Sequence, residues 1–313
     1  MHSFLKRQKD RLQFAYHGVR NWWPIWFFVL NRQSRRVWRR VAPTLREQES
    51  KIVETLLRDG IAIAHIRDLF PQGTFEALLK EFEIRKAKPF ASQTSHGGME
   101  MMQKGGKGTK TFMKYFWGGG GTNPELDTKS LFIQFALSDI AIRIVGNYFG
   151  SAPKFHGFSL QETVLVPKGE MPYLSQRWHR DPDDKKICKV FLYLNDVDSE
   201  TTGPFMYVKG SQLGGKWRHL FPQRPPVGRY PDPGAVEKAV SKEDIQVCLG
   251  KAGTMVFCDT SGLHRGGYST EKTRAMFATG FATKASVHPV NYTLPGNVLN
   301  ENLSSLVKYA LTL

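Results

Sequence analysis

The chain of 313 residues has few cysteines, few acidic residues and no long apolar run. Its three cysteines, Cys188, Cys248 and Cys258, form no Cys-x-x-Cys pair. This odd, widely spaced set excludes a disulfide framework and predicts reduced, buried thiols in a cytoplasmic protein. The apolar run at residues 21–30 is shorter than the about 20 residues that span a bilayer. It also lacks the small-residue cleavage site of a signal peptide.

Acidic residues are outnumbered, with 28 Asp and Glu against 44 Lys and Arg, which gives a net charge of +16. The first 50 residues hold eleven basic and three acidic residues, so half of the net charge lies there. We interpret residues 1–46 as a basic arm. Its aromatic residues either insert into a membrane interface, with the arginines at lipid headgroups, or pack on the rest of the protein. These aromatic residues are Trp22, Trp23, Trp26, Phe27 and Phe28.

Single-stranded nucleic acid is a third partner that basic and aromatic residues together can bind. No recognised nucleic-acid motif accompanies the arm, so we disfavour this interpretation. The sequence leaves the oligomeric state open. It favours a cytoplasmic protein that is peripheral to a membrane if the arm docks there.

Residues 47–313 read as one domain that is rich in strands. The 29 glycines and 17 prolines suit many turns, and the apolar content of 41% supports a packed core. A helix is predicted with Thr44 as N-cap and an end at Gly60, and a second helix over residues 71–82. Strands are predicted at residues 61–64, 189–197, within 202–211, 253–260 and 273–281.

Residues 92–123 form a segment rich in glycine and lysine inside this domain. They contain nine glycines, with Lys104, Lys107, Lys110 and Lys114 between them. A long segment of this kind is either a surface excursion or functional. We favour a lid that closes over the active site and contacts an anionic substrate.

Candidate chemistry is concentrated in Trp178-His179-Arg180-Asp181 and in two residues far downstream. His179 and Asp181 are two positions apart, so on a strand both side chains point to one face. With His264 they make two imidazoles and one carboxylate, the facial triad of non-haem Fe(II) oxygenases. Arg274, ten residues after His264, offers a permanently charged planar fork for a carboxylate.

The segments around this motif resemble the phytanoyl-CoA dioxygenase family, a branch of the Fe(II)- and 2-oxoglutarate-dependent oxygenases. The resemblance covers roughly residues 50–285 and follows the order and spacing of the family. It is carried by residues 178–181, 191–197, 203–205, 210–211 and 262–267.

This resemblance implies a mostly β fold with flanking α-helices, a double-stranded β-helix or cupin-like jelly roll. It implies that His179, Asp181 and His264 ligate Fe(II). It also implies that Arg274 anchors the cosubstrate 2-oxoglutarate, which is consumed together with O2. Because the carboxylate ligand Asp181 is present, hydroxylation or desaturation is favoured over the halogenation of relatives that bind chloride in its place.

Four further polar residues are candidates for contacts with the cosubstrate. Gln161 and Gln176, which precede the His-x-Asp motif, would bond the cosubstrate or orient a metal ligand. Thr254 and Thr273 would share the distal carboxylate with the arginine. For each of them an ordinary hydrogen bond within the β-structure is the alternative. Trp178 is interpreted as a core residue.

The basic segments of the chain are the features that favour one class of substrate. The lysine-rich segment, Lys185, Lys186 and the basic arm favour an anionic, amphipathic molecule such as an acyl-CoA, a lipid, a glycolipid or a secondary metabolite. Lys189 and Arg265 are alternative carboxylate anchors. A contrasting hypothesis is a non-catalytic cupin-like binding protein with a membrane- or nucleic-acid-docking arm. The intact triad and arginine favour the enzyme.

Overall fold

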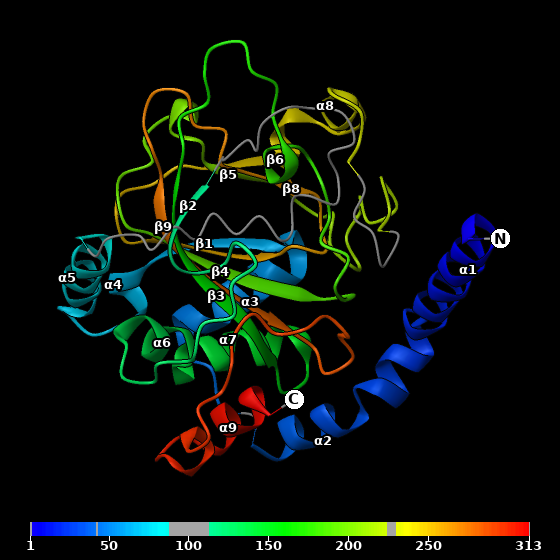
Figure 1. Cartoon of the computed structure of the whole chain (residues 1–313). Helices are drawn as coiled ribbons and strands as arrows, with labels where there is room; N and C mark the ends of the chain where they lie inside the picture. Colours follow the sequence, from blue (N-terminus) through cyan, green and yellow to red (C-terminus); the bar gives the residue numbers. More distant parts are fainter. Residues whose placement is uncertain (1, 42, 88–112, 224–229, 313) are drawn as a thin grey trace.

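The computed structural model describes residues 2–41, 43–87, 113–223 and 230–312, and its strands form two antiparallel sheets (Figure 1). The larger sheet has the order β1-β7-β4-β9-β3-β2, and the smaller sheet has the order β6-β5-β8. The strands are β1 Ile61–His65, β2 Met113–Gly118, β3 Lys154–Thr163, β4 Ile187–Tyr193, β5 Phe205–Val208, β6 Ile245–Cys248, β7 Thr254–Asp259, β8 His264–Arg265 and β9 Ala275–Ala282.

The order of the strands along the chain is that of a jelly roll. An isolated antiparallel bridge between His179 and His264 places the His-x-Asp motif beside β8 in the smaller sheet. Along the chain, β3, β4, β7 and β9 belong to the larger sheet. The bridge at His179, the pair β5 and β6, and β8 alternate with them and belong to the smaller sheet, so the chain passes repeatedly between the two sheets. Eight strands distributed in this way over two packed sheets define a jelly roll. The predicted mostly β fold with flanking helices is therefore confirmed, with β1 and β2 added at the two edges of the larger sheet.

Strand β4 shows how the sequence sorts side chains between the two faces of the larger sheet. Val190 and Leu192 belong to the main core, which this sheet shares with the helices. Phe191 and Tyr193 point the other way, toward the smaller sheet, because successive residues of a strand alternate. Lys189 shares the face of Phe191 and therefore points between the sheets.

Helices cover the outer face of the larger sheet (Figure 1). They contribute Leu56, Phe132 and Ile144 to the main core. These helices are α3 Glu47–Asp59, α4 Ile66–Leu69, α5 Thr74–Ala87, α6 Leu131–Ala136, α7 Asp139–Phe149 and α9 Ser305–Leu311. A further short helix, α8 Ala235–Ala239, packs against the smaller sheet through the buried Val236. The three cysteines are free and buried, as predicted.

Helix α3 begins later than the sequence predicted, so Thr44 is not its N-cap. The N-cap is Arg46, whose backbone N–H donates to Oε2 of Glu49 at 3.0 Å. Glu49 is fixed there because Arg143 of α7 donates to both of its carboxylate oxygens, at 2.6 and 3.0 Å. This buried pair forms only in the tertiary structure, which explains why local sequence misplaced the cap.

The other predicted elements are present with shifted ends. Gly60 ends α3 with a φ of 77°, in the left-handed region that favours glycine. The helix predicted over residues 71–82 lies at 74–87, and the strand predicted at 189–197 starts at Ile187 and ends at Tyr193. Such shifts at element ends are expected, because hydrophobic periodicity marks the middle of an element better than its ends.

The predicted arm divides into two parts that behave differently. Helix α1 (His2–Arg20) extends away from the sheets, whereas the π-helix η1 (Ile25–Leu30) and α2 (Arg32–Val41) lead back along the body (Figure 1). Trp26 and Trp38 are buried, with 3% and 4% of their surface exposed. Trp22 remains 62% exposed and Phe28 59%. The arm is therefore partly packed on the body and partly exposed. No helix among the described residues is long and apolar enough to cross a membrane.

Trp26 attaches the arm to the segment that follows the His-x-Asp motif. Its indole Nε1 donates to Oδ1 of Asp184 at 2.7 Å, and Thr283 donates to Oδ2 from both its backbone N–H and its hydroxyl. Burial raises the pKa of the Asp184 carboxyl to about 6, although these hydrogen bonds favour the charged form. A buried carboxylate that loses a donor remains partly unsatisfied, and this is costly.

We therefore expect Trp26→Phe to lower the free energy of unfolding by about 1.5–3 kcal/mol, the usual loss for a hydrogen bond to a charged group. The loss should be larger above the Asp184 pKa than below it, because the carboxylate is ionised only above it. Urea denaturation at two pH values measures both effects. Trp22→Phe, at an exposed position, is the matched control and should change stability by less than about 0.5 kcal/mol. Equal losses for the two variants would contradict the assignment.

Candidate metal centre

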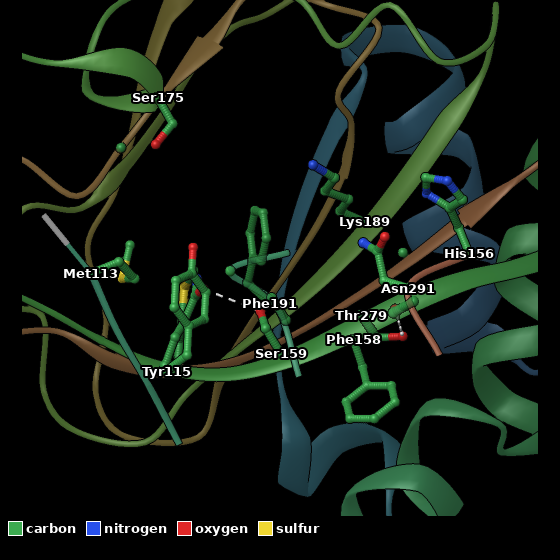
Figure 2. Close-up of a pocket in the computed structure, with 18 of the residues that line it drawn as sticks. Met113, Tyr115, His156, Phe158, Ser159, Ser175, Lys189, Phe191, Thr279 and Asn291 are labelled. Atoms are coloured by element: carbon green, nitrogen blue, oxygen red, sulfur yellow. Dashed lines mark hydrogen bonds between the residues drawn. The ribbon is translucent and has the colours of Figure 1, made fainter. Parts of the chain in front are cut away.

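A cavity of about 340 Å³ lies between the two sheets (Figure 2), and its lining includes Gln161, His179, Lys189, His264 and Arg274. Tyr115 and Phe191 line it with aromatic rings, and His179 and His264 reach it from the smaller sheet. A cavity of this size accommodates a small ligand.

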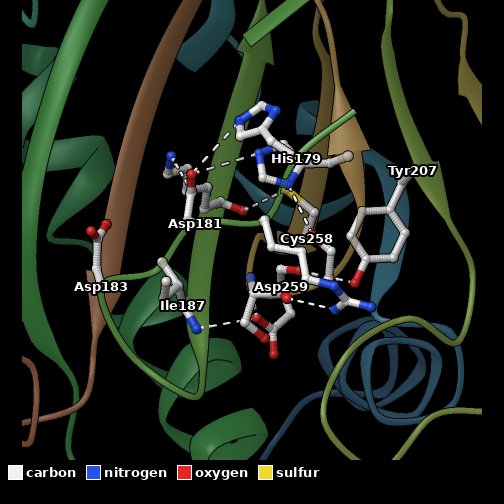
Figure 3. Close-up of polar contacts among 12 residues, drawn as sticks. His179, Asp181, Asp183, Ile187, Tyr207, Cys258 and Asp259 are labelled. Atoms are coloured by element: carbon white, nitrogen blue, oxygen red, sulfur yellow. Dashed lines mark hydrogen bonds and ion pairs between the residues drawn. The ribbon is translucent and has the colours of Figure 1, made fainter. Parts of the chain in front are cut away.

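The three predicted metal ligands converge beside this cavity, and Figure 3 shows His179 and Asp181 side by side. Nε2 of His179 lies 3.8 Å from Oδ1 of Asp181, and Nε2 of His264 lies 3.9 Å from the same oxygen. The ligand atoms of all three residues lie within 4.8 Å of one another. Ligands about 2.1 Å from one ion lie roughly 3–4.2 Å apart, so the arrangement fits one shared metal ion.

Backbone carbonyls fix the tautomer of both imidazoles. Nδ1 of His179 lies 2.8 Å from the carbonyl oxygen of Arg177, and Nδ1 of His264 lies 3.0 Å from that of Gly262. A carbonyl oxygen only accepts, so each Nδ1 carries the proton and donates it. Each Nε2 therefore presents its lone pair, which is the form that binds a metal.

Burial and neighbouring charges set the protonation states of the site. Burial lowers the pKa of both imidazoles, to about 3 for His264, so both are neutral at neutral pH. Burial opposes ionisation of Asp181, but Lys189 and the two imidazoles outweigh it and hold the pKa of this carboxyl well below its usual range. Nζ of Lys189 lies 2.7 Å from Oδ2 of Asp181, on the oxygen that does not face the histidines. The site offers two neutral nitrogens and one anionic oxygen.

Two neighbouring contacts hold the metal-binding segments in place. The buried guanidinium of Arg180 donates to the backbone carbonyl oxygens of Ser211, Trp217, Leu220, Phe221 and Ser261. These bonds fix the backbone between His179 and Asp181. On the second segment, a Cβ at Gly262 would lie 2.0 Å from the hydroxyl oxygen of Tyr207, so only glycine fits two residues before His264.

Arg274 lies directly before β9 and also lines the cavity. It is 2% exposed, and its Nε and Nη1 have no hydrogen-bond partner among the described residues. Its backbone is fixed by two bonds with Thr163, of 2.8 and 3.0 Å. A Cβ at Gly266 would lie 3.4 Å from Nη1, so this glycine leaves room beside the guanidinium. A buried guanidinium with free donors is costly unless an anion pairs with it, and the cavity is where that anion can bind.

Of the four further candidates, Gln161 alone lies in the cavity wall. It is on β3, and its Oε1 accepts a hydrogen bond from Ser159, which also lines the cavity. Strand β2 pairs with this part of β3, and its Met113 and Tyr115 close the same side. Residues 113–118 are therefore a sheet edge and not part of a lid. Residues 92–112 of the predicted lid lie outside the described residues.

Gln176, Thr254 and Thr273 do not reach the cavity, which corrects their predicted contacts with the cosubstrate. The buried amide of Gln176 exchanges hydrogen bonds of 2.9 and 3.1 Å with two backbone groups. The hydroxyl of Thr254 donates to the carbonyl oxygen of Lys251 at 2.7 Å, and that of Thr273 to the carboxylate of Glu162 at 3.1 Å. Each side chain makes an ordinary hydrogen bond to a nearby backbone group or side chain. This is the alternative that the sequence analysis gave for these residues.

The other cationic side chains that the sequence singled out differ in whether they face the cavity. Arg265 points away from the cavity, with its guanidinium carbon 4.7 Å from the ring centroid of Trp178 and Nη1 3.4 Å from Glu237. Trp178 is buried in the core, as interpreted from the sequence. Lys186 donates to a backbone carbonyl at 2.8 Å outside the cavity. Among the predicted cations that the structure describes, Lys189 alone lines the cavity beside Arg274.

Sequence reasoning missed a second group of side chains on the cavity wall, formed by His156, Asp183 and His288. These residues come from β3, the loop before β4 and the segment after β9. No two of them stand at a spacing that signals a metal site, so only the folded chain reveals the group.

No protein-family model and no curated protein matches this sequence. Among solved structures, the chain is similar to EctD from S. alaskensis with 2-oxoglutarate and 5-hydroxyectoine, at 16% identity over 77% of each chain and a TM-score of 0.49. It is also similar to AviO1 from Streptomyces viridochromogenes Tue57, at 16% identity over 79% of this chain and 100% of that chain, with a TM-score of 0.45. The non-heme alpha-ketoglutarate-dependent epimerase SnoN from nogalamycin biosynthesis gives 16% identity, coverage of 75% and 82%, and a TM-score of 0.45.

These identities and TM-scores are too low to transfer an activity or a ligand to this chain. The resemblance to phytanoyl-CoA dioxygenases remains a prediction from the motifs. The functional argument rests on the geometry of the site.

Proposed function

We propose that this chain is an Fe(II)- and 2-oxoglutarate-dependent dioxygenase that hydroxylates a C–H bond. One observation carries the proposal: the converging His179, Asp181 and His264 lie beside the same cavity as the buried guanidinium of Arg274, whose Nε and Nη1 have no hydrogen-bond partner among the described residues. An iron ion needs the first group, and a 2-oxo acid with a distal carboxylate needs the second.

The residues fit both groups. Nε2 of His179, Nε2 of His264 and Oδ1 of Asp181 would hold Fe(II) and leave positions open for other ligands. Arg274 would bind the distal carboxylate of 2-oxoglutarate through parallel N–H···O bonds. When bound, the iron and the cosubstrate supply O2 activation and oxidation of the C–H bond, which no amino-acid side chain can perform.

The protein's own part is to bind, orient and exclude water. Lys189 keeps Asp181 ionised and occupies its Oδ2, so that Oδ1 remains for the metal. The carbonyls of Arg177 and Gly262 keep both Nε2 lone pairs available. The aromatic wall of the cavity shields the centre from bulk water, which would otherwise compete for reactive species.

For the substrate we propose a small or amphipathic anionic molecule, in the class of an acyl-CoA, a lipid, a glycolipid or a secondary metabolite. Its apolar part would contact the rings of Tyr115 and Phe191. The net positive charge of the chain would attract it to the protein.

A succinate-release assay tests this function. The purified chain is supplied with Fe(II), 2-oxoglutarate and O2 and presented with a library of anionic and lipid-like metabolites. We expect succinate to form in proportion to one product whose mass increases by one oxygen atom. If metabolites bind but succinate never exceeds the level without metabolite, the non-catalytic binding protein is favoured instead.

We further propose that the exposed part of the arm docks on an anionic membrane. Its exposed large apolar side chains are Leu12, Phe14, Tyr16, Val19, Trp22, Trp23, Phe28 and Val29. Exposed arginines lie among them, at positions 11, 32, 36, 39 and 40. Apolar side chains left in water beside basic ones are typical of interfacial anchors.

Vesicle co-sedimentation tests the docking. We expect the full chain to bind phosphatidylserine vesicles at low salt, to bind more weakly at high salt and to ignore neutral vesicles. The double variant Trp22→Ala, Phe28→Ala should bind at least tenfold more weakly, since each buried aromatic contributes about 1.5–3 kcal/mol. Both positions are exposed, so the fold should persist. Equal binding to neutral vesicles, or none to anionic vesicles at low salt, would contradict the proposal.

A further inference from the structure

Three side chains outside the proposed iron site form a second candidate metal site on the wall of the same cavity. Ligand atoms of His156, Asp183 and His288 lie within 4.8 Å of one another. Nε2 of His288 is 3.3 Å from Oδ1 of Asp183, and the two imidazole centroids are 5.5 Å apart. Two imidazoles and one carboxylate are again a donor set that transition metals prefer.

His156 is the observation that points to a ligand. It is 7% exposed, and its Nε2 is fully buried without a hydrogen-bond partner among the described residues. Figure 2 shows this ring at the end of the cavity that holds Lys189 and Asn291, away from Met113 and Tyr115. Burial lowers the pKa of His156 to about 4, so its nitrogen is a neutral electron-pair donor at neutral pH. A buried polar atom that lacks a partner is unfavourable unless something binds it.

Hydrogen bonds already hold the other two ligands in place. The hydroxyl of Ser286 donates to the carbonyl oxygen of Asp183 at 3.2 Å and accepts from the backbone N–H of His288 at 3.3 Å. The adjacent Asp184 binds Thr283, so the two loops are joined at a second point. The backbone therefore pre-organises the pair, while the half-exposed ring of His288 gives an ion access from solvent.

We propose that His156, Asp183 and His288 bind a divalent transition-metal cation, separate from the iron of the proposed function. Three protein ligands leave at least one coordination position for a further oxygen. Because all three residues line the cavity, an anionic group of a bound molecule can take that position. The inference does not depend on the proposed oxygenase activity.

The neighbouring cations limit the affinity of this second site without preventing binding. Lys189 and Lys154 both act on His156 electrostatically and disfavour positive charge there. The ammonium of Lys189 is paired with Asp181 at 2.7 Å, so much of its charge is already balanced. Burial and the nearby Asp181 raise the pKa of Asp183, and the carboxylate form is the one that binds the cation.

Zn²⁺ stoichiometry measured by equilibrium dialysis and metal analysis tests the proposal, with no need for turnover. We expect two Zn²⁺ per wild-type chain. Either His288→Ala or His264→Ala should leave one ion, and the variant with both substitutions should bind none. Loss of a direct ligand should weaken the affected site by more than about 100-fold, since loss of an outer contact alone costs 10–100-fold.

Two further variants keep the result interpretable. Asp183→Asn removes the anionic ligand at nearly constant shape, and it should also leave one ion. His219→Ala removes an exposed histidine outside both groups and should leave two. Two ions in both His288→Ala and Asp183→Asn, or one wild-type ion that His264→Ala loses and His288→Ala keeps, would overturn the second site. One wild-type ion that His288→Ala loses and His264→Ala keeps would support the second site and contradict the first. An equal loss in His219→Ala would mean adventitious surface binding and would also overturn it.

Discussion

Replacing His179 with alanine is expected to abolish Fe(II) binding at the proposed centre and all 2-oxoglutarate turnover, while the two sheets remain folded. The Nε2 lone pair of His179 is one of the three converging donors. A site left with Asp181 and His264 should bind Fe(II) more than about 100-fold more weakly, since even outer contacts contribute 10–100-fold. Iron analysis after anaerobic reconstitution measures binding, and succinate release measures turnover.

The fold should survive this change because His179 contributes little to the core. Its backbone N–H and carbonyl bond those of His264, and alanine keeps both hydrogen bonds. Circular dichroism and urea denaturation check this point. His219→Ala, at an exposed position, is the matched control and should keep full iron content. A His179→Ala protein that retains wild-type iron content and turnover would mean that the metal is elsewhere.

Replacing Arg274 with lysine is expected to raise the KM for 2-oxoglutarate by roughly 10- to 100-fold. Lysine keeps the positive charge but replaces a planar fork, which donates two parallel bonds, with a point charge. The lost charge-assisted bond is worth about 1.5–3 kcal/mol, and this converts to that range. The measurement is succinate release as a function of 2-oxoglutarate concentration.

Two comparisons sharpen this second prediction. Arg265→Lys changes a guanidinium that points away from the cavity toward Trp178 and Glu237, so it should leave the KM unchanged. If Arg274→Lys leaves the KM unchanged as well, the anchor must be another cation. Lys189 is the remaining predicted cation in the cavity, although its charge is used by Asp181.

Sequence predicted β1, β4, β5, β7 and β9, but no bounds were predicted for β2, β3, β6 and β8. β4 and β7 are covered on both faces, so they appear as continuous apolar runs that hydrophobicity detects. Sequence could not predict which strand follows which within a sheet from these runs alone. The resemblance implied only a jelly roll, and the structure shows the order through the pairing of β3, β9, β4 and β7.

The metal ligands could be predicted from the sequence because they stand a few positions apart or inside a recognisable motif. His179 and Asp181 stand two positions apart, and His264 follows a strand and a glycine-rich turn that the motifs marked. The sequence alone could not show which of Gln161, Gln176 and Thr254 faces the cavity, because all three are polar residues in or near β-structure. Only the tertiary structure shows that the first two bond nearby backbone groups and that Gln161 faces the cavity.

The arm also shows that local sequence does not predict long-range contacts. Composition indicated either a membrane anchor or a packed appendage, and the structure buries some of the aromatic residues and leaves others exposed. Trp26 packs inward because Asp184 accepts from its indole, whereas Trp22 has no such buried partner among the described residues and stays exposed. A contact between residues 158 positions apart leaves no trace in the local sequence.

The central claim is that His179, Asp181, His264 and Arg274 together bind Fe(II) and 2-oxoglutarate. Anaerobic absorption spectroscopy tests it most directly, because iron chelated by a 2-oxo acid has a visible charge-transfer band that neither component shows alone. We predict that this band appears in the wild type only when both are present, that it is absent in His179→Ala, and that Arg274→Lys needs roughly 10- to 100-fold more 2-oxoglutarate to reach it. No band in the iron-loaded wild type at saturating 2-oxoglutarate would contradict the account.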